Sequence, residues 1–231
     1  MNSEPQQPED PYDEGISEST YVNARDNYNA KAATYDRWSS WERPFWEKGL
    51  DLLQLQPGAQ LFEVGYGTGQ ACEYAINTYQ CSQVAGIDIS EKMQQAARQR
   101  VPKGDFQCGD IATIENYENC SKMMGQYDAV FCSFCLEIFE TNLLRKVVEN
   151  MTKFLAPDGK ICIVSMSKQG GWRLMQSVYE MSHARCPSSV DCRPIYLKRL
   201  ILSLSDSLEI VEAHVLPMYG LSAEIVIAKR K

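Results

Sequence analysis

Residues 61–70 read LFEVGYGTGQ, an apolar stretch that runs into three glycines spaced two residues apart. The apolar residues up to Val64 predict a short buried strand, and Gly65, Gly67 and Gly69 predict a tight turn that opens a helix. Such a turn lets the backbone approach a ligand closely and directs the first N–H groups of the helix toward it. Glu63 adds a carboxylate to the same turn. The stretch therefore predicts a ligand site at the carboxyl end of a first strand.

Strands and helices alternate along most of the chain around this turn. Apolar runs that are each followed by a helical pattern predict a parallel sheet covered on both faces. The expected strands of this sheet are residues 60–64, 83–89, 105–108, 127–133 and 160–166. The expected helices begin near residue 69, run from 91 to 101 and from 141 to 155, and continue with 172–183 and a helix after residue 194. Strands at 208–216 and 224–229 predict a closing antiparallel hairpin.

Two further acids follow strands of this predicted sheet. Asp88 ends the second strand, where a carboxylate can accept both hydroxyls of a ribose. Asp110 ends the third strand, where a carboxylate can face an adenine amino group. A nicotinamide cofactor shares the ribose contact, but its fingerprint requires Gly or Ala where this chain has Gln70. Three neighbouring strand ends thus outline one nucleotide-like ligand lying across the sheet.

These motifs together resemble a known family. The segments EVGYGTG, GIDIS, CGDI, YDAVFCSFCLE and LAPDGKICIVS occur in the order found in class I S-adenosylmethionine (SAM)-dependent methyltransferases. The chain is most similar to the small-molecule branch that includes ubiquinone/menaquinone C-methyltransferase-like proteins, through YNAKAATYDRW near its start and MYGLSAEIVIAKRK at its end. The resemblance covers residues 28–231. It implies an α/β, Rossmann-like fold with a seven-stranded, mainly parallel sheet, an antiparallel last strand and helices on both faces.

The resemblance also implies which residues bind SAM, which leaves the reaction as S-adenosylhomocysteine. The glycines would lie against its methionine portion, the two aspartates would bind ribose and adenine, and the N-terminal tyrosines would close the site. The residues that the resemblance assigns to the cofactor are Tyr28, Tyr35, Glu63, Gly65, Gly67, Gly69, Asp88, Ile89, Asp110, Ile111, Phe131, Cys132 and Ser133. One departure is Tyr66, where a small residue or Cys is commoner; a bulky side chain there is expected to narrow the pocket.

The acceptor site is expected between the N-terminal helices and residues 167–195. Its aromatic and apolar candidates are Trp38, Trp172, Met175 and Tyr179, which favour an apolar or aromatic acceptor. Glu137 and His183 are the candidate catalytic bases. For both, a structural role remains open: Glu137 as a surface residue opening a helix, His183 as a core histidine. The helical spacing in 172–183 is also that of ordinary core packing.

Composition and charge limit the partners of this protein. The net charge of −7 disfavours a nucleic-acid acceptor, because phosphate backbones are anionic. No apolar run reaches the roughly 18 to 20 residues that span a bilayer, and no secretory signal is evident, so a cytoplasmic protein is expected. The nine cysteines are interpreted as reduced thiols, with no metal site among them. The chain is expected to act as a monomer or homodimer.

The expected domain organisation is simple. Residues 1–20 predict a disordered acidic tail, and residues 21–231 one methyltransferase domain. Within it, 21–55 predict a helical cap of two short helices separated near Pro44, and 167–195 a cover on the acceptor side.

Three other functions remain open from the sequence. An aminopropyl transferase shares the fold, although only Glu137 supplies an acid after the fourth strand. A nicotinamide oxidoreductase would require a glycine-rich motif with Gly or Ala at the position of Gln70. A SAM-binding pseudoenzyme that supports a partner subunit would keep the glycines and aspartates without turnover.

Overall fold

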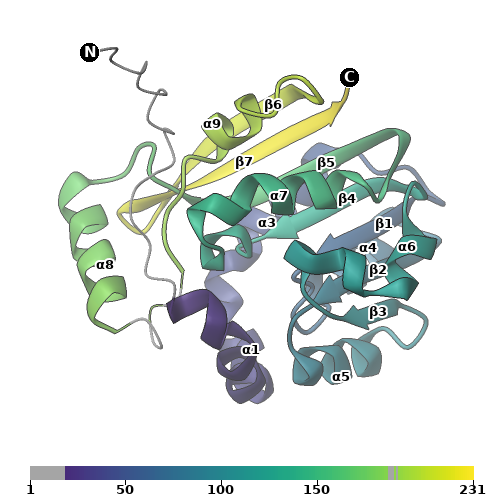
Figure 1. Ribbon diagram of the computed structural model, residues 1–231, viewed down its shortest axis with the longest axis horizontal. Helices are drawn as coiled ribbons and strands as arrows, with labels where there is room; N and C mark the ends of the chain where they lie inside the picture. Colours follow the sequence, from purple (N-terminus) through teal and green to yellow (C-terminus); the bar gives the residue numbers. More distant parts are fainter. Residues whose placement is uncertain (1–18, 187–189, 191) are drawn as a thin grey trace, which may run out of the picture.

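The computed structural model describes residues 19–186, 190 and 192–231. They form one seven-stranded sheet with the strand order β3-β2-β1-β4-β5-β7-β6 (Figure 1). The strands are β1 Gln60–Val64, β2 Gln83–Asp88, β3 Asp105–Cys108, β4 Tyr127–Ser133, β5 Leu155–Ser167, β6 Leu208–Met218 and β7 Leu221–Arg230. β1 to β5 run parallel, and β7 lies antiparallel between β5 and β6. The predicted fold class is confirmed, including the closing hairpin at one edge.

Helices cover both faces of this sheet. The α-helices are α1 Ser19–Lys31, α2 Tyr35–Trp38, α3 Arg43–Leu53, α4 Gln70–Tyr79, α5 Glu91–Arg100, α6 Glu118–Met123, α7 Thr141–Thr152, α8 Arg173–Arg185 and α9 Leu197–Leu202. Buried side chains of α3, α4 and α5 pack in one hydrophobic cluster with one face of the sheet. Those of α6, α7 and α9 pack in a second cluster on the opposite face. The apolar strands are therefore buried on both sides, as a parallel sheet requires.

Local sequence accounts for most element boundaries. Ser90 caps α5, because its side chain accepts a hydrogen bond from the backbone N–H of Met93 at 3.1 Å. β5 begins at Leu155, five residues earlier than predicted, since Leu155 pairs with Tyr127 ahead of a register shift in the ladder. The residues Pro157, Asp158 and Gly159, whose composition is typical of a turn, lie within this strand.

The N-terminal segment is divided more finely than expected. Two 3₁₀ turns, Ala32–Thr34 and Ser39–Glu42, separate α1, α2 and α3. Pro44 lies in the first turn of α3, where its missing N–H costs no hydrogen bond. Helix α3 buries its apolar face in the core, through Phe45, Trp46, Leu50 and Leu53. The tail predicted for residues 1–20 lies almost wholly outside the described residues.

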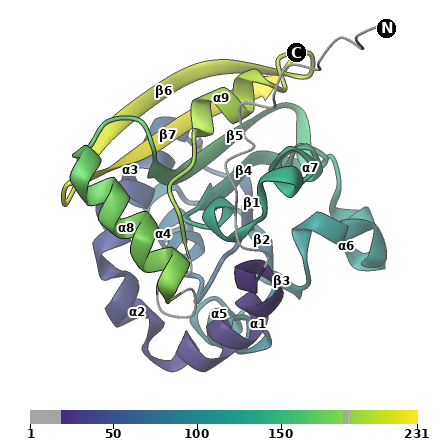
Figure 2. The same cartoon turned by 60° about the vertical axis from the view of Figure 1, so that its left-hand side comes forward.

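Helix α8 lies apart from the two packed layers (Figures 1 and 2). It follows β5 and stands beside the β6–β7 turn. His183 is the one residue of α8 that is buried, whereas Trp172 just before the helix and Val178 within it are exposed. The interpretation of this helical pattern as core packing is therefore wrong for most of its apolar residues.

Candidate active site

The glycine-rich loop between β1 and α4 adopts the backbone that its composition predicts. Gly65, Gly67 and Gly69 have φ angles of +71°, +52° and +83°, a region that other L-residues rarely adopt. The Gly65 N–H donates to the carbonyl of Ile87 at 2.8 Å, which holds the loop against β2. A Cβ atom at Gly65 would lie 2.6 Å from the sulfur of Cys135. The close contact leaves no room for a side chain at this position.

Asp88 lies at the carboxyl end of β2, facing the same loop. Its carboxylate accepts the N–H of Gly67 and the N–H of Ser90, both at 2.9 Å. Burial raises the pKa of this carboxyl to about 6, although the two N–H donors favour its charged form. A carboxylate offers about four lone-pair sites, so two remain for a ligand's hydroxyl groups.

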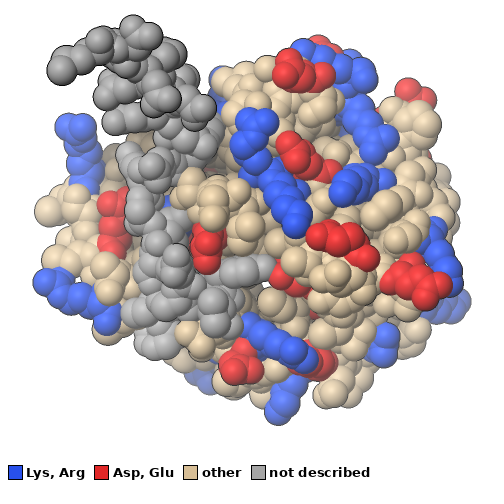
Figure 3. Space-filling model, in the orientation of Figure 1, with Lys and Arg blue, Asp and Glu red and all other residues tan. Residues whose placement is uncertain are grey.

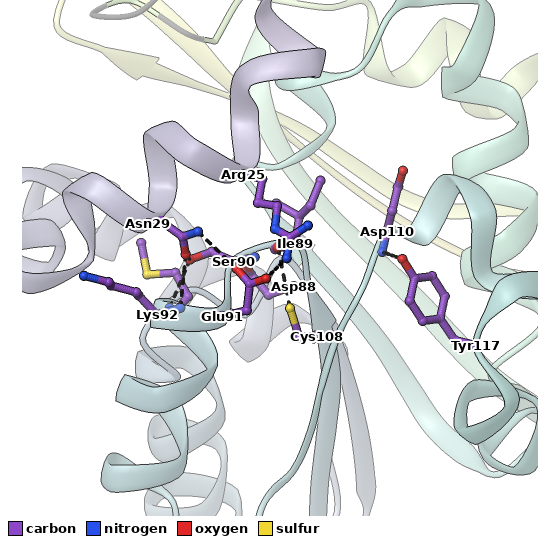
Figure 4. A network of polar contacts seen from close by, with 11 residues as sticks. Arg25, Asn29, Asp88, Ile89, Ser90, Glu91, Lys92, Cys108, Asp110 and Tyr117 are labelled. Atoms are coloured by element: carbon purple, nitrogen blue, oxygen red, sulfur yellow. Dashed lines mark hydrogen bonds and ion pairs between the residues drawn. The ribbon is translucent and has the colours of Figure 1, made fainter.

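Asp110 occupies the equivalent place at the end of β3 (Figure 4). Its side chain accepts the N–H of Ala112 at 2.8 Å and caps the 3₁₀ turn Ile111–Asn116. Its own N–H donates to the hydroxyl of Tyr117 at 3.1 Å, and a Cβ at Gly109 would lie 2.8 Å from that ring. The Tyr117 ring thus packs on the strand end and keeps the Asp110 backbone in place.

A cleft runs along these strand ends. Nine of the residues predicted to bind the cofactor line it: Tyr28, Tyr35, Gly65, Gly67, Asp88, Ile89, Asp110, Ile111 and Ser133. Its other lining residues, which the sequence reasoning missed, are Val64, Ile87, Gly109, Phe134, Cys135, Ile138 and Phe139.

Most of the missed residues were within reach of the sequence pattern. Three of them are sequence neighbours of predicted residues: Val64, Ile87 and Gly109. Cys135 lies in the segment YDAVFCSFCLE, which contains the fourth strand. Ile138 and Phe139 had no local signal, because their position depends on the 3₁₀ turn Leu136–Ile138.

Four predicted cofactor residues do not line this cleft. Gly69 precedes α4 and packs against Ala97, 3.2 Å from where its Cβ would lie. Phe131 and Cys132 are fully buried within β4, beneath the surface of the cleft. Glu63 instead lines a smaller adjoining hollow.

The carboxyl of Glu63 is buried beneath the glycine-rich loop. It accepts a hydrogen bond from the thiol of Cys72 at 3.0 Å. Burial raises its pKa to about 8, and the charge of Asp88 acts in the same direction. Glu63 therefore holds a proton at neutral pH, and a cation placed in the hollow would favour its ionised form.

Tyr66 points away from the main cleft. Its hydroxyl donates to the carbonyl of Gln107 at 2.9 Å, and its ring packs on Phe106 with centroids 4.7 Å apart. The side chain is 3% exposed and borders only the smaller hollow beside Glu63. The narrowing expected from this residue therefore does not arise in the main cleft.

The N-terminal helices lie over the cleft and are attached to both donor-side loops. At the end of β2, the Ser90 hydroxyl donates to the side-chain oxygen of Asn29 at 2.7 Å, and the Asn29 amide donates to Glu91 at 3.0 Å (Figure 4). At the glycine-rich loop, the Thr68 hydroxyl donates to Asp36 at 2.5 Å. Arg100 pairs with the same carboxylate. These contacts place Tyr28 and Tyr35 over the cleft.

A second, open cavity adjoins the cleft. Tyr28 and Tyr35 line both cavities and form the boundary between them. The remaining walls of the second cavity are mostly aromatic or apolar: Lys31, Trp38, Ser39, Trp41, Glu42, Met166, Tyr179, Val190 and Cys192. Of the predicted acceptor residues, Trp38 and Tyr179 thus line it.

The other two predicted acceptor residues lie elsewhere. Met175 packs against the β6–β7 turn, where a Cβ at Gly220 would lie 3.1 Å from its Cγ atom. Trp172 adjoins the same glycine and is 72% exposed.

Both candidate bases are buried rather than exposed. One oxygen of Glu137 accepts the N–H of Met166 at 2.6 Å, and the other has no hydrogen-bond partner among the described residues. Burial raises the pKa of this carboxyl to about 8, against the opposing charge of Arg193. His183 has Nδ1 2.6 Å from the carbonyl of Val190. Neither side chain reaches the surface of either cavity.

Comparisons with known proteins agree with this geometry. Residues 61–159 match the family model described as a methyltransferase domain. A non-reducing polyketide synthase of Penicillium brasilianum is 32% identical over 120 residues, which make up 49% of this chain and 5% of that protein. Malonyl-acyl-carrier-protein O-methyltransferase 2 of Ilyobacter polytropus is 23% identical over 153 residues, 66% of this chain and 57% of that protein. The chain thus spans only a small part of the polyketide synthase that it matches.

A solved structure extends the comparison to almost the whole fold. Magnesium protoporphyrin IX methyltransferase from Synechocystis, with bound S-adenosylhomocysteine, matches with a TM-score of 0.65 at 17% identity. The match covers 92% of this chain and 100% of that one. Residues 61–159 thus match a methyltransferase domain, and almost the whole chain shares the fold of a solved methyltransferase.

Proposed function

We propose that this protein transfers a methyl group from SAM to a small apolar or aromatic acceptor by in-line displacement. The observation that carries the proposal is the junction of two cavities at Tyr28 and Tyr35. One cavity has the carboxylates and glycines of the donor site, and the walls of the other are mostly aromatic or apolar. A methyl carbon near these two rings would face an acceptor in the second cavity.

The donor-side residues fit the parts of SAM, which supplies an electrophilic methyl group on a sulfonium. Asp88 would accept the ribose hydroxyls through its two remaining lone-pair sites. Ile89 and Ile111 would pack on the adenine, and Asp110 would accept from its amino group. The carboxyl of Glu63 would ionise against the donor's ammonium, because a nearby cation lowers a pKa that burial has raised.

The acceptor-side residues act mainly by position and by excluding water. Holding nucleophile, carbon and sulfur in line supplies much of the rate enhancement, and aromatic walls such as Tyr179 do not oppose the dispersal of positive charge. The resemblance to quinone C-methyltransferases also favours a ring-shaped apolar acceptor. The two named methyltransferases above act on a malonyl-acyl-carrier protein and on magnesium protoporphyrin IX, so they do not select one acceptor.

Of the two candidate bases, Glu137 is the one attached to the walls of both cavities, although its buried carboxyl lines neither of them. It lies between Cys135 and Ile138, which line the donor cleft, and it is hydrogen-bonded to the backbone of Met166, which lines the acceptor cavity. With its pKa near 8, it is protonated at neutral pH. To remove a proton from the acceptor, its carboxyl must become exposed to the acceptor cavity when ligands bind, and the rate should then rise as pH increases toward 8. His183 lies one helical turn beyond Tyr179 and is the alternative base.

The donor assignment is tested by isothermal titration calorimetry with SAM, S-adenosylhomocysteine and NADH. We expect binding of both sulfur nucleotides, no binding of NADH, and at least about a tenfold loss of affinity in Asp88→Asn. Asp128→Asn is the matched control, because Asp128 also accepts a backbone N–H, from Gln60 at 2.8 Å, at the opposite end of the strands. Absence of SAM binding by folded protein would refute the proposal.

Transfer itself is tested with isotopically labelled SAM and a panel of apolar, aromatic and thioester-bound acceptors. Methylated product that disappears in Asp88→Asn would support an enzyme. Donor binding without transfer to any acceptor would favour the pseudoenzyme, and transfer from decarboxylated SAM alone would favour an aminopropyl transferase.

A further inference from the structure

Helix α8 exposes its apolar side chains to solvent, which is the reverse of the usual arrangement for a helix on a protein surface. Gln176, Tyr179 and His183, spaced three and four residues apart, face the protein. Leu174 and Met181 lie on the opposite face and are 76% and 49% exposed. A helix that packs only on its own domain turns its apolar stripe inward. The outer face of α8 is therefore suited to burial against something else.

The apolar surface continues beyond the helix onto the β6–β7 turn. Trp172 is bound to this turn, because its N–H donates to the carbonyl of Gly220 at 2.8 Å. Tyr219, in the same turn, is 79% exposed. The docking face, as we call this surface, comprises Trp172, Leu174, Met175, Val178, Met181 and Tyr219. A contiguous exposed patch of this kind marks an interaction surface.

The docking face adjoins the acceptor cavity. Tyr179, on the inner side of α8, lines that cavity, and so does Trp38 across from it. Trp38 is itself 74% exposed, so an apolar side chain also stands at the other rim. An apolar molecule held at the docking face would have a short route into the cavity.

The charge around the docking face differs from that of the whole protein. Residues 167–186 contain three basic residues and one acidic residue, in a chain whose net charge is −7. Lys168 pairs with Glu180 at 3.6 Å, and Arg173 and Arg185 are exposed at the two ends of α8. Figure 3 shows two groups of Lys and Arg side chains on the left-hand side of the molecule, where α8 lies, with an acidic group between them. This arrangement is complementary to an anionic surface.

We propose that the docking face binds the surface of a lipid bilayer that contains anionic lipids. Leucine and methionine can enter the acyl boundary, Trp172 and Tyr219 prefer the level of the headgroups, and the terminal arginines attract anionic headgroups. No helix among the described residues is long and apolar enough to cross a membrane, so the contact is peripheral. The proposal goes beyond methyl transfer and does not depend on it.

A second copy of this chain is a less favourable occupant. A twofold dimer through the docking face would bring the same patch of both copies together. Arg173 and Arg185 of one copy would then lie near those of the other, and the one acid of α8, Glu180, is paired with Lys168. A bilayer with anionic lipids removes that repulsion.

The test is co-sedimentation of the full chain with vesicles of phosphatidylcholine containing about 30% phosphatidylserine. The variant Leu174→Gln/Met181→Gln removes the outer stripe and keeps good helix formers. Leu202→Gln is the matched control, because this leucine of α9 is 51% exposed outside the docking face. We expect wild type and control to sediment with the vesicles, and the double variant to lose at least about tenfold in partitioning. Binding should weaken with pure phosphatidylcholine and with added salt.

Two results would overturn the proposal. One is wild-type protein that stays in the supernatant. If light scattering then shows a wild-type dimer and a monomeric double variant, the docking face joins two copies instead. The other is a double variant that sediments as wild type does. SAM titration of each variant is a separate readout, so failure of the donor assignment would be distinguishable from failure to bind lipid.

Discussion

Replacing Gly65 by alanine should destabilise the protein and weaken SAM binding together. Gly65 has a φ of +71°, and an L-residue in the left-handed region costs about 1–2 kcal/mol. The added Cβ would also lie 2.6 Å from the sulfur and 2.8 Å from the Cβ of Cys135. Overpacking of this kind costs about 1–3 kcal/mol more. Since Cys135 lines the donor cleft, its displacement should reduce SAM affinity about tenfold.

Gly58→Ala separates the two contributions. Gly58 has a φ of +89°, but nothing lies within 4 Å of its added Cβ, so this variant carries the backbone cost alone. In a domain of this size about 1 kcal/mol shifts Tm by about 2–4 °C, so Gly65→Ala should melt about 2–12 °C below Gly58→Ala. Differential scanning calorimetry and SAM titration of both variants measure this. Equal Tm losses with unchanged SAM affinity would refute the reasoning.

Three further predictions concern the site. Asn29→Ala should weaken SAM binding about three- to tenfold in calorimetry, because it detaches α1 from Ser90, whereas Asn119→Ala, which removes an exposed amide hydrogen bond elsewhere, should not. SAM affinity should fall as pH decreases below about 6, because protonated Asp88 loses acceptor sites. A SAM affinity that stays unchanged down to pH 5 would contradict this. In the native state Glu137 keeps its proton up to about pH 8, whereas in the unfolded chain it releases the proton near pH 4.5. The free energy of unfolding should therefore fall by about 1 kcal/mol per pH unit as pH rises between these values. Glu63 has a similarly raised pKa, so Glu137→Gln should reduce the slope in denaturant titrations by about 1 kcal/mol per pH unit and leave the part due to Glu63. An unchanged slope would exclude Glu137 as a source.

The strands and the glycine-rich loop were predictable because their signals are local. β1, β3 and β4 have the predicted bounds, since an apolar run bounded by turn residues defines a buried strand. Asp88 and Asp110 were expected at strand ends, and parallel strands bring such ends to one edge. The resemblance to methyltransferases added the tyrosines that lie over the cleft.

Burial and the direction of helix faces were not predictable in the same way. The sequence predicts Glu137 at the exposed start of a helix. In the structure, the 3₁₀ turn Leu136–Ile138 places its carboxyl 2.6 Å from the N–H of Met166, nearly thirty residues later. Trp172 and Met175 have core-like spacing, yet α8 directs them to the β6–β7 turn and solvent. Spacing defines a face of a helix but not what that face meets.

The sequence by itself determined the parallel sheet, the loop at Gly65 and the carboxylates that follow β2 and β3. Each of these depends on backbone conformation and on residues a few positions apart. Only the tertiary structure decided that Tyr28 and Tyr35 separate two cavities, that Glu137 is buried between them, and that α8 turns its apolar stripe outward. These features arise from contacts between residues far apart in the chain, where packing and desolvation outweigh local preference.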